Sequence, residues 1–184
     1  MNSNEINIAV VGATGAAGGT ALELLLERNH PAEKIVPMAS SRSAGRKIAY
    51  GDVELTIVEA KAEAFDRIDV ALFAAGGLVS RRLAHKAVEK GVFVIDKGSI
   101  FRMDPTIPLV VPEVNGDDID WHPGIVSTPN CTSTPLVMVL DALRSISPIK
   151  AVTVATYQSV TGTGIAANEE LLEQSRTVLA GGMA

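Results

Sequence analysis

Short apolar runs alternate along this chain with segments of helical period. The branched residues at 6–11 predict a strand, and an apolar stripe with Leu22 and Leu26 predicts the amphipathic helix that follows it. Strands that alternate with helices usually form βαβ units around a parallel sheet. The pattern therefore predicts an α/β fold with a doubly wound, mostly parallel sheet.

The same pattern predicts the remaining elements and a domain boundary. Further strands are expected at 34–39, 54–59, 69–75, 92–96, 109–114 and 124–128, and helices at 80–90 and 135–145. A last strand at 150–158 and a helix at about 165–179 are too small to bury a core of their own. We therefore expect one domain at 1–134 and the beginning of a second at 135–184, in a fragment of a longer protein.

Three glycines lie between the first predicted strand and its helix, in "VVGATGAAGG". Gly12 suits a tight turn, Gly15 a close approach of the backbone to a pyrophosphate, and Gly18 close packing of helix on sheet. The helix start adds free N–H groups and a positive dipole end. The motif predicts a Rossmann-like dinucleotide-binding turn, with a purely structural turn as the alternative.

The end of the second predicted strand indicates which dinucleotide would bind. An acidic residue at this place typically binds the ribose 2′-hydroxyl of NAD, but the segment "ASSRSAGRK" has none. Ser40, Ser41 and Ser43 offer hydroxyls, and the planar cation of Arg42 suits a phosphate. The segment favours NADP, and the alternative is a solvated polar loop.

The only cysteine, Cys131, lies in "STPNCTSTP" between a predicted strand and a predicted helix. Thr134 as N-cap and Pro135 at the first helical position would mark the helix start. A thiol there is close to the positive helix end, which favours the nucleophilic thiolate, and backbone N–H groups could stabilise an oxyanion. The alternative is a buried, small apolar side chain.

No residue in the chain is a convincing base for that cysteine. His30, His85 and His122 all have surface or turn contexts, so the base either lies in a longer chain or does not exist. No Cys/His cluster has the spacing of metal ligands, and we expect no metal site.

Composition and charge narrow the class of partner. The hydrophobic fraction of 47% is that of a globular protein, and a net charge of -5 argues against nucleic acid and anionic membranes. A single cysteine forms no internal disulfide, the amino terminus has an acidic residue where a signal peptide is basic, and no apolar run suits a membrane helix. We expect a cytoplasmic protein that binds small molecules.

The chain resembles the amino-terminal half of aspartate-semialdehyde dehydrogenase along nearly its whole length. The matching segments, in order, are "VVGATGAAG", "ASSRSAGRK", "DVALFAAG", Ser99 to Arg102, "PLVVPEVN", "PNC" and "ATYQSVTGTG". The resemblance implies reversible, NADP-dependent oxidation of L-aspartate 4-semialdehyde, with phosphate, to 4-aspartyl phosphate. That reaction belongs to lysine, threonine and methionine biosynthesis, and the family's proteins are homodimers.

The resemblance also implies a role for individual residues. Cys131 would be the thioester-forming nucleophile, Arg102 and Asn130 would bind phosphate or substrate, and Gln158 would position the substrate for catalysis. The remaining matches are cofactor contacts: Gly12, Thr14, Gly15, Ala16, Ala17, Ser40, Arg42, Ser43, Gly76, Thr161 and Gly162. In the implied mechanism the Cys131 thiolate attacks the aldehyde, the hemithioacetal gives hydride to NADP, and phosphate cleaves the thioester.

The sequence departs from the family's pattern in three ways. It has "NCTST" where the family often has Asn-Cys-Ser-Thr, and Lys97 and Gly98 occupy places that are Asn and Thr in the family's "DNTS"-like segment. The family's acid/base histidine lies beyond residue 184, so we expect this fragment to be inactive alone. The alternatives are an enzyme like N-acetyl-gamma-glutamyl-phosphate reductase, whose cysteine segment usually reads Gly-Cys-Tyr-Pro, and a non-catalytic dinucleotide-binding paralogue.

Overall fold

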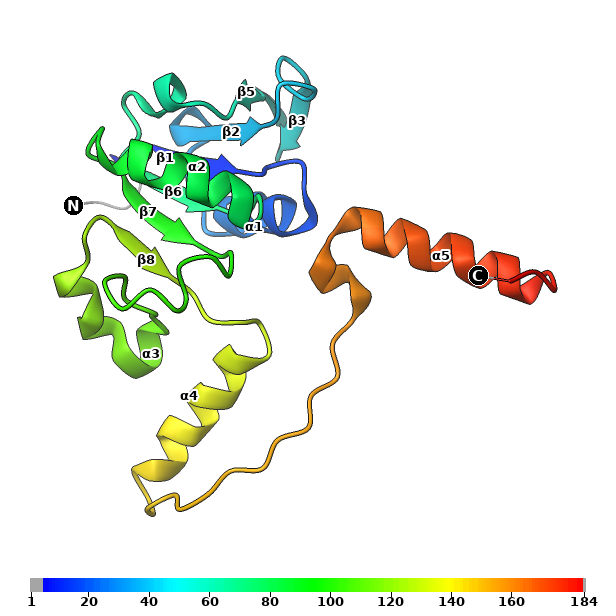
Figure 1. The fold of residues 1–184 in the computed structure, drawn as a ribbon. Coiled ribbons are helices and arrows are strands. Elements are labelled where there is room, and N and C mark those ends of the chain that lie inside the picture. The colour runs from blue at the N-terminus through cyan, green and yellow to red at the C-terminus, as the bar shows by residue number, and fades with distance from the viewer. Residues whose placement is uncertain (1–4, 184) are drawn as a thin grey trace. The chain divides into compact units, whose positions relative to one another are not determined.

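Six parallel strands form the central sheet in the computed structural model, which describes residues 5–183 (Figure 1). The strand order is β5-β2-β1-β6-β7-β8. The strands are β1 Ile8–Val11, β2 Ile35–Ala39, β5 Val58–Glu59, β6 Val70–Phe73, β7 Phe93–Asp96 and β8 Ile125–Ser127. From β1 the chain builds one side of the sheet through β2 and β5, then crosses to build the other through β6, β7 and β8. The predicted doubly wound topology is confirmed.

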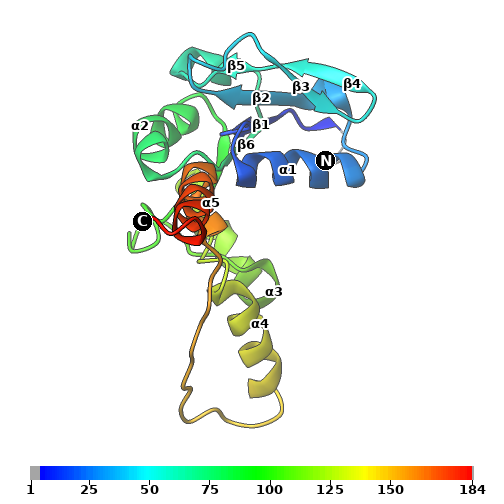
Figure 2. The same cartoon turned by 90° about the vertical axis from the view of Figure 1, so that its right-hand side faces the viewer.

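Helices cover both faces of this sheet. The helices packed on it are α1 Ala16–Glu27 and α2 Gly77–Val88. The structure also describes the helices α3 Pro112–Asn115, α4 Ser133–Arg144 and α5 Ile165–Leu179. Val11 belongs to the same buried cluster as Leu83 of α2, whereas Val10 clusters with Leu22 of α1. Because successive strand residues point to opposite faces, α1 and α2 lie on opposite sides of the sheet (Figures 1 and 2). Burial on both faces explains the uninterrupted apolar run in β1.

The predicted strand at 54–59 is divided between two sheets. Val53–Thr56 forms β4, which pairs antiparallel with β3 at Lys47–Tyr50, whereas β5 joins the main sheet. β3 was not predicted, although Gly51 and Asp52 between two apolar segments are typical of a hairpin turn. Gly51 has a φ of 60°, as that turn requires.

The predicted strand at 109–114 is wrong. Only Leu109 pairs with the sheet, through an isolated bridge to Ser127, and the helix α3 begins at Pro112. Proline has no N–H for a strand ladder but suits the first turn of a helix. The Asn115 side chain also accepts a hydrogen bond from the Val111 amide at 2.8 Å, which stabilises this helical turn.

The described residues divide into two units, Met1–Lys150 and Ala151–Ala184. The second unit contains a 3-10 turn at Val160–Thr163 and the predicted helix α5, which is confirmed. The predicted strand at 150–158 is wrong, because no segment among residues 5–183 pairs with it. Alternating apolar side chains alone do not form a strand when the backbone lacks a hydrogen-bonding neighbour.

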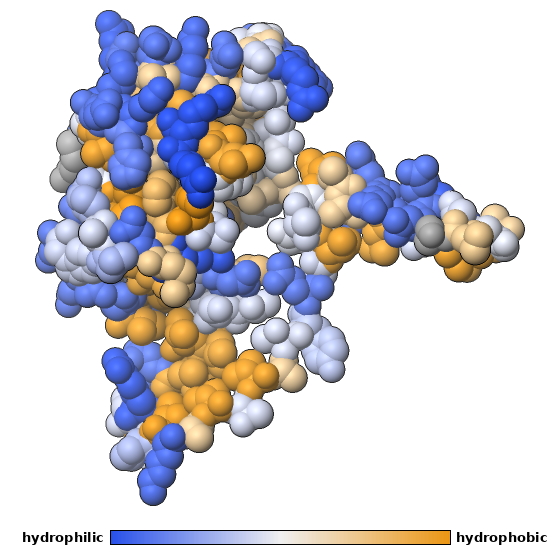
Figure 3. All heavy atoms as spheres, viewed as in Figure 1, coloured by the Kyte–Doolittle hydropathy of each residue, from blue (hydrophilic) through white to orange (hydrophobic). Residues whose placement is uncertain are grey.

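The helix α4 has an apolar face that nothing covers in the part of the chain the structure describes. It has no buried residue, although Met138, Val139 and Leu143 are exposed apolar side chains along it. Apolar residues gather over this helix in the space-filling view (Figure 3). Such a face usually marks a surface that packs against another element. None of the helices described is long and apolar enough to cross a membrane.

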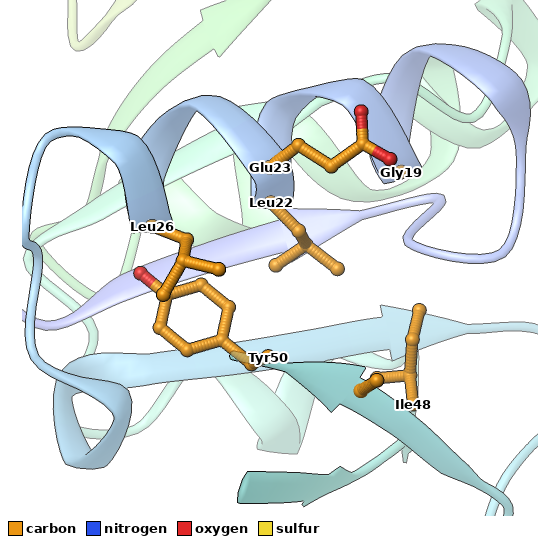
Figure 4. Close-up of a pocket in the computed structure, with 7 residues that line it drawn as sticks. Gly19, Leu22, Glu23, Leu26, Ile48 and Tyr50 are labelled. Atoms are coloured by element: carbon orange, nitrogen blue, oxygen red, sulfur yellow. The ribbon is translucent and has the colours of Figure 1, made fainter. Parts of the chain in front are cut away.

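Two adjacent glycines of α1 provide a test of the packing between this helix and β1. A Cβ at Gly18 would lie 2.0 Å from the Gly12 carbonyl oxygen, whereas at Gly19, beside a shallow pocket, it would meet nothing within 4 Å (Figure 4). Gly18→Ala is expected to lower the free energy of unfolding by about 3 kcal/mol or more. The control Gly19→Ala should raise it by about 0.5–1 kcal/mol. Urea unfolding measures both, and equal effects would contradict the close approach.

Candidate functional site

The predicted site residues of the first unit lie along one edge of the sheet. The strands β2, β1, β6, β7 and β8 are consecutive neighbours and run parallel, so their carboxyl ends share that edge. The segments that leave these ends, in the order of the strands, are Ser40–Ser43, Gly12–Ala17, Ala74–Gly76, Lys97–Arg102 and Thr128–Cys131. Open α/β sheets bind ligands at this edge, next to the strand where the order reverses.

The glycine-rich turn after β1 has the geometry that its spacing predicts. Gly12 has a φ of 95°, and a Cβ there would lie 2.8 Å from the Ala74 carbonyl carbon, in the turn after β6. Gly18 packs against the Gly12 carbonyl, as described above. The first and third glycines therefore permit a tight turn and a close contact between helix and turn, and both structural roles are confirmed.

The start of α1 leaves room for an anion. Gly15 is the N-cap, and no side chain caps the helix. Thr14, Ala16 and Ala17 are exposed around it. A helix start whose N–H groups have no side-chain partner, next to small residues, suits a phosphate group.

The segment after β2 is a turn that presents Arg42 to solvent. The Ser43 amide donates to the Ser40 carbonyl at 2.9 Å, which closes the turn. Arg42 is exposed and forms no ion pair with any residue between 5 and 183. Its five guanidinium donors are therefore not occupied by a carboxylate, as a phosphate contact requires.

Arg102 is held by backbone oxygens rather than by a carboxylate. Its Nε donates to the Thr128 carbonyl at 2.9 Å, and its Nη2 donates to the Lys97 carbonyl at 3.1 Å. The half-buried side chain makes no ion pair within the described residues. These bonds join the loops after β7 and β8, so a cation with spare donors lies beside the segment that carries Cys131.

Cys131 is exposed, which excludes the alternative that it is a buried apolar side chain. Its Sγ lies 3.5 Å from Asn130 Oδ1, which also accepts from the Thr132 amide at 2.9 Å. The helix α4 begins at Ser133, so the predictions of Thr134 as N-cap and Pro135 as first helical residue are wrong. The Asn130 side chain makes the turn earlier, and proline is tolerated anywhere in the first helical turn.

A buried polar pair that was not predicted lies at the same edge. Asp96 ends β7, is fully buried, and accepts a hydrogen bond of 2.5 Å from the equally buried Ser80 of α2. Burial raises the pKa of Asp96, and the Ser80 hydrogen bond, the Gly98 amide and the Arg102 charge offset part of that rise. The available signal was an acidic residue that ends an otherwise apolar strand, since carboxylates are rarely buried without a partner.

The predicted residues Gln158, Thr161 and Gly162 belong to the second unit. A Cβ at Gly162 would lie 2.1 Å from Gln158 Nε2, so these two residues are in close contact. Ser159 fixes the turn between them, because its Oγ accepts from the Thr161 hydroxyl at 3.0 Å. The other predicted site residues all belong to the first unit.

The three histidines have structural contacts of their own. His30 is buried rather than at the surface, and its Nε2 lies 3.0 Å from the Ile6 carbonyl oxygen. His122 accepts a hydrogen bond from the Gly124 amide, and His85 packs edge-on against Phe101. Across residues 5–183, no cluster of three His, Cys, Asp or Glu side chains could hold a metal ion.

Comparisons with known proteins find a family model and relatives that match most of the chain. Residues 7–122 match the family model described as "Semialdehyde dehydrogenase, NAD binding domain". The aspartate-semialdehyde dehydrogenase of Bacillus subtilis is 45% identical over 95% of this chain and 50% of its own length. The chain thus spans about half the length of the curated relatives it matches.

Solved structures share the fold over most of this chain. The Vibrio cholerae aspartate semialdehyde dehydrogenase II, complexed with ASA, has a TM-score of 0.90 and 38% identity, over 97% of this chain and 54% of its own. The Candida albicans enzyme, determined with NADP, has a TM-score of 0.65 and 28% identity, over 78% of this chain and 48% of its own. The agreement covers both described units of the chain.

The pH dependence of stability tests the state of the buried carboxyl. The pKa of Asp96 is raised above 3.8, the ordinary pKa of an Asp side chain. The stabilisation that Asp96 contributes is therefore complete below pH 3.8 and is lost as the pH rises through the pKa in the folded state. Asp96→Asn cannot titrate, so its free energy of unfolding relative to the parent should rise as the pH increases from about 3.5 to 7.5 in urea unfolding.

Asp104 is the matched control with the opposite sign. Hydrogen bonds from the Thr106 side chain and amide lower the pKa of Asp104, so its stabilising contribution is present above pH 3.8 and is lost as the pH falls. Asp104→Asn should therefore become less stable relative to the parent as the pH rises. If the relative stability of both variants changed with pH in the same direction, the opposite pKa shifts assigned to Asp96 and Asp104 would be contradicted.

Proposed function

Because the chain belongs to the semialdehyde dehydrogenase family, we propose that it is the amino-terminal part of an aspartate-semialdehyde dehydrogenase. The complete protein would oxidise L-aspartate 4-semialdehyde, with phosphate, to 4-aspartyl phosphate in lysine, threonine and methionine biosynthesis. One observation carries the proposal: Arg102 donates a hydrogen bond to the Thr128 carbonyl, which places a cation suited to phosphate beside the Cys131 segment. Both lie at the edge of the sheet that also holds the glycine-rich turn.

The cofactor in this proposal is NADP, and its chemistry is to accept a hydride. The residues present fit this cofactor. Gly12 brings the glycine-rich turn close to the turn after β6, and the start of α1 has no side-chain cap. Arg42 has no carboxylate partner among the described residues. Thr14, Ala16 and Ala17 would surround the pyrophosphate, and Ser40 and Ser43 would bind with Arg42 near the adenosine phosphate. The Gly76 turn would face the nicotinamide half.

Cys131 would carry the covalent step. Its thiolate forms a bond from Sγ to the aldehyde carbon, and the former carbonyl oxygen takes a proton from the acid/base group. As a hydride leaves that carbon for the cofactor, the acid/base group would take the hydroxyl proton back, and a thioester would remain. A phosphate oxygen held by Arg102 and oriented by Asn130 then attacks the thioester carbon, and Cys131 leaves as the thiolate.

The proposal divides the chain into a cofactor domain at 1–134 and the beginning of a catalytic and dimer-forming domain at 135–184. The uncovered apolar face of α4 supports this division, because a following domain would pack against it. Gln158 and Gly162, which are in contact, would position substrate and nicotinamide together with Thr161. The acid/base histidine would lie in the half that relatives have beyond this chain. The fragment would be inactive alone, and the full protein a cytoplasmic homodimer that binds neither nucleic acid nor membrane.

Phosphate-dependent reduction of NADP by the full-length gene product with aspartate 4-semialdehyde tests the proposed function. Cys131→Ala should lower the rate by about a thousandfold or more, because it removes the proposed thioester-forming group. Arg102→Ala should raise the KM for phosphate by about tenfold to a hundredfold, the effect of losing a charged hydrogen bond.

Two outcomes would overturn the proposed function. A full-length protein that binds NADP but converts no semialdehyde would be the non-catalytic paralogue. A protein that acts only on N-acetyl-gamma-glutamyl phosphate would be the other reductase.

The choice of NADP over NAD is tested on this chain by calorimetric titration. Arg42→Ala should weaken NADP binding by about tenfold to a hundredfold, since one charged contact to the 2′-phosphate is lost, and leave the Kd for NAD within about twofold. Arg42→Lys keeps the charge but not the planar donor pair, so its Kd for NADP should lie between those of the parent and of Arg42→Ala. An equal loss for both cofactors would contradict a 2′-phosphate contact.

A further inference from the structure

Asp96 and Ser80 are fully buried polar residues that the proposed chemistry does not use. Ser80 donates to Asp96 Oδ1 at 2.5 Å. Asp96 is the last residue of β7, directly before the loop that leads to Arg102. Burying a carboxyl group costs free energy unless its contacts offset the loss of hydration. The contacts that Asp96 makes in this place therefore need an explanation.

Hydrogen bonds connect this pair to three turns of the candidate site. On one side, Ser80 Oγ also lies 3.4 Å from the Gly76 carbonyl oxygen, in the turn before α2. On the other side, the Asp96 carbonyl accepts from the Thr128 amide at 2.9 Å. The Thr128 carbonyl in turn accepts from Arg102 Nε. One continuous set of bonds thus runs from Gly76 to Arg102.

The carboxyl also constrains the loop between Asp96 and Arg102. A Cβ at Gly98 would lie 3.1 Å from Asp96 Oδ2, closer than most Cβ contacts, so the loop passes directly over the carboxyl group. Lys97, between them, supplies the carbonyl that accepts from Arg102 Nη2. The Asp96 carboxyl group therefore limits the conformations that this loop can adopt at Gly98.

We propose that Asp96, through its bond to Ser80, is a positioning residue that fixes Arg102 and the Thr128–Cys131 segment relative to the Gly76 turn. The inference rests on the proposed function for what Arg102 binds, but the positioning itself is a property of this chain. Without the carboxyl, β7 loses its hydrogen bond to Ser80 of α2 and the loop loses its contact at Gly98. Arg102 then keeps its two backbone bonds for a smaller fraction of the time.

Substitutions at the pair, with a control on the next strand, test this role. Asp96→Ala removes the carboxyl, Asp96→Asn keeps its shape and an acceptor, and Ser80→Ala removes only the partner. The control is Ser127→Ala. Ser127 is also fully buried and lies opposite Asp96 on β8. Its Oγ has no hydrogen-bond partner among the described residues. Exchange of the Arg102 Nε–H with water, followed by NMR on the 184-residue chain, reports the position of Arg102 without any activity.

Asp96→Ala should speed this exchange by about tenfold, the effect of losing one net hydrogen bond, whereas Asp96→Asn and Ser127→Ala should stay within about twofold of the parent. In the full-length protein, Asp96→Ala should raise the KM for phosphate, with a smaller change in kcat, and Asp96→Asn should restore it. If Asp96→Ala does not fold, Ser80→Ala decides, and its exchange should be faster than that of Ser127→Ala.

Unchanged Arg102 exchange in folded Asp96→Ala or Ser80→Ala, whatever the change in Tm, would overturn the proposal, because the pair would then only stabilise the fold. Equal acceleration in Ser127→Ala would overturn it too. Faster exchange in a protein whose full-length form oxidises no semialdehyde would leave the positioning role intact and refute the proposed function instead.

Discussion

The in-register parallel pairing of the strands is the constraint on which the rest of the structure depends. β1 pairs with β2 and β6, and β7 pairs with β6 and β8, all in the same direction. Every segment that leaves a carboxyl end therefore begins at one edge. Segments more than a hundred residues apart in sequence, such as Gly12–Ala17 and Thr128–Cys131, share an edge because the hydrogen-bonding ladder places them there.

Close approach of backbone to backbone forms the cofactor side of that edge. Gly12 lies against the turn after β6, and Gly18 lies against the Gly12 carbonyl, so no side chain fits at either place. The exposed donors at the start of α1 are consequently main-chain N–H groups, whose direction is fixed by the helix rather than by rotamers. This arrangement suits an anionic ligand at little cost in conformational entropy.

The other side of the edge depends on how Arg102 is held. Carbonyl oxygens of Thr128 and Lys97 orient the guanidinium, and no carboxylate among residues 5–183 forms an ion pair with it. In a chain of net charge -5 this leaves a fixed cation near an exposed thiol. In the proposed function, an anion bound by Arg102 and an electrophile bound to Cys131 would be brought together by two neighbouring loops, as the proposed attack of phosphate on a thioester requires.

Local sequence pattern was enough to predict the sheet's topology class, the glycine turn and the candidate nucleophile, because periodicity and turn chemistry are local properties. Features that need a partner distant in the sequence became visible only in the folded chain. The segment 150–158 has the alternation of a strand but no neighbour to pair with among residues 5–183. Pro112 and Asn115 turn an expected strand into a helix. Local pattern likewise gives no sign that Asp96 meets Ser80, since burial and hydrogen bonding between distant residues arise only when the chain packs.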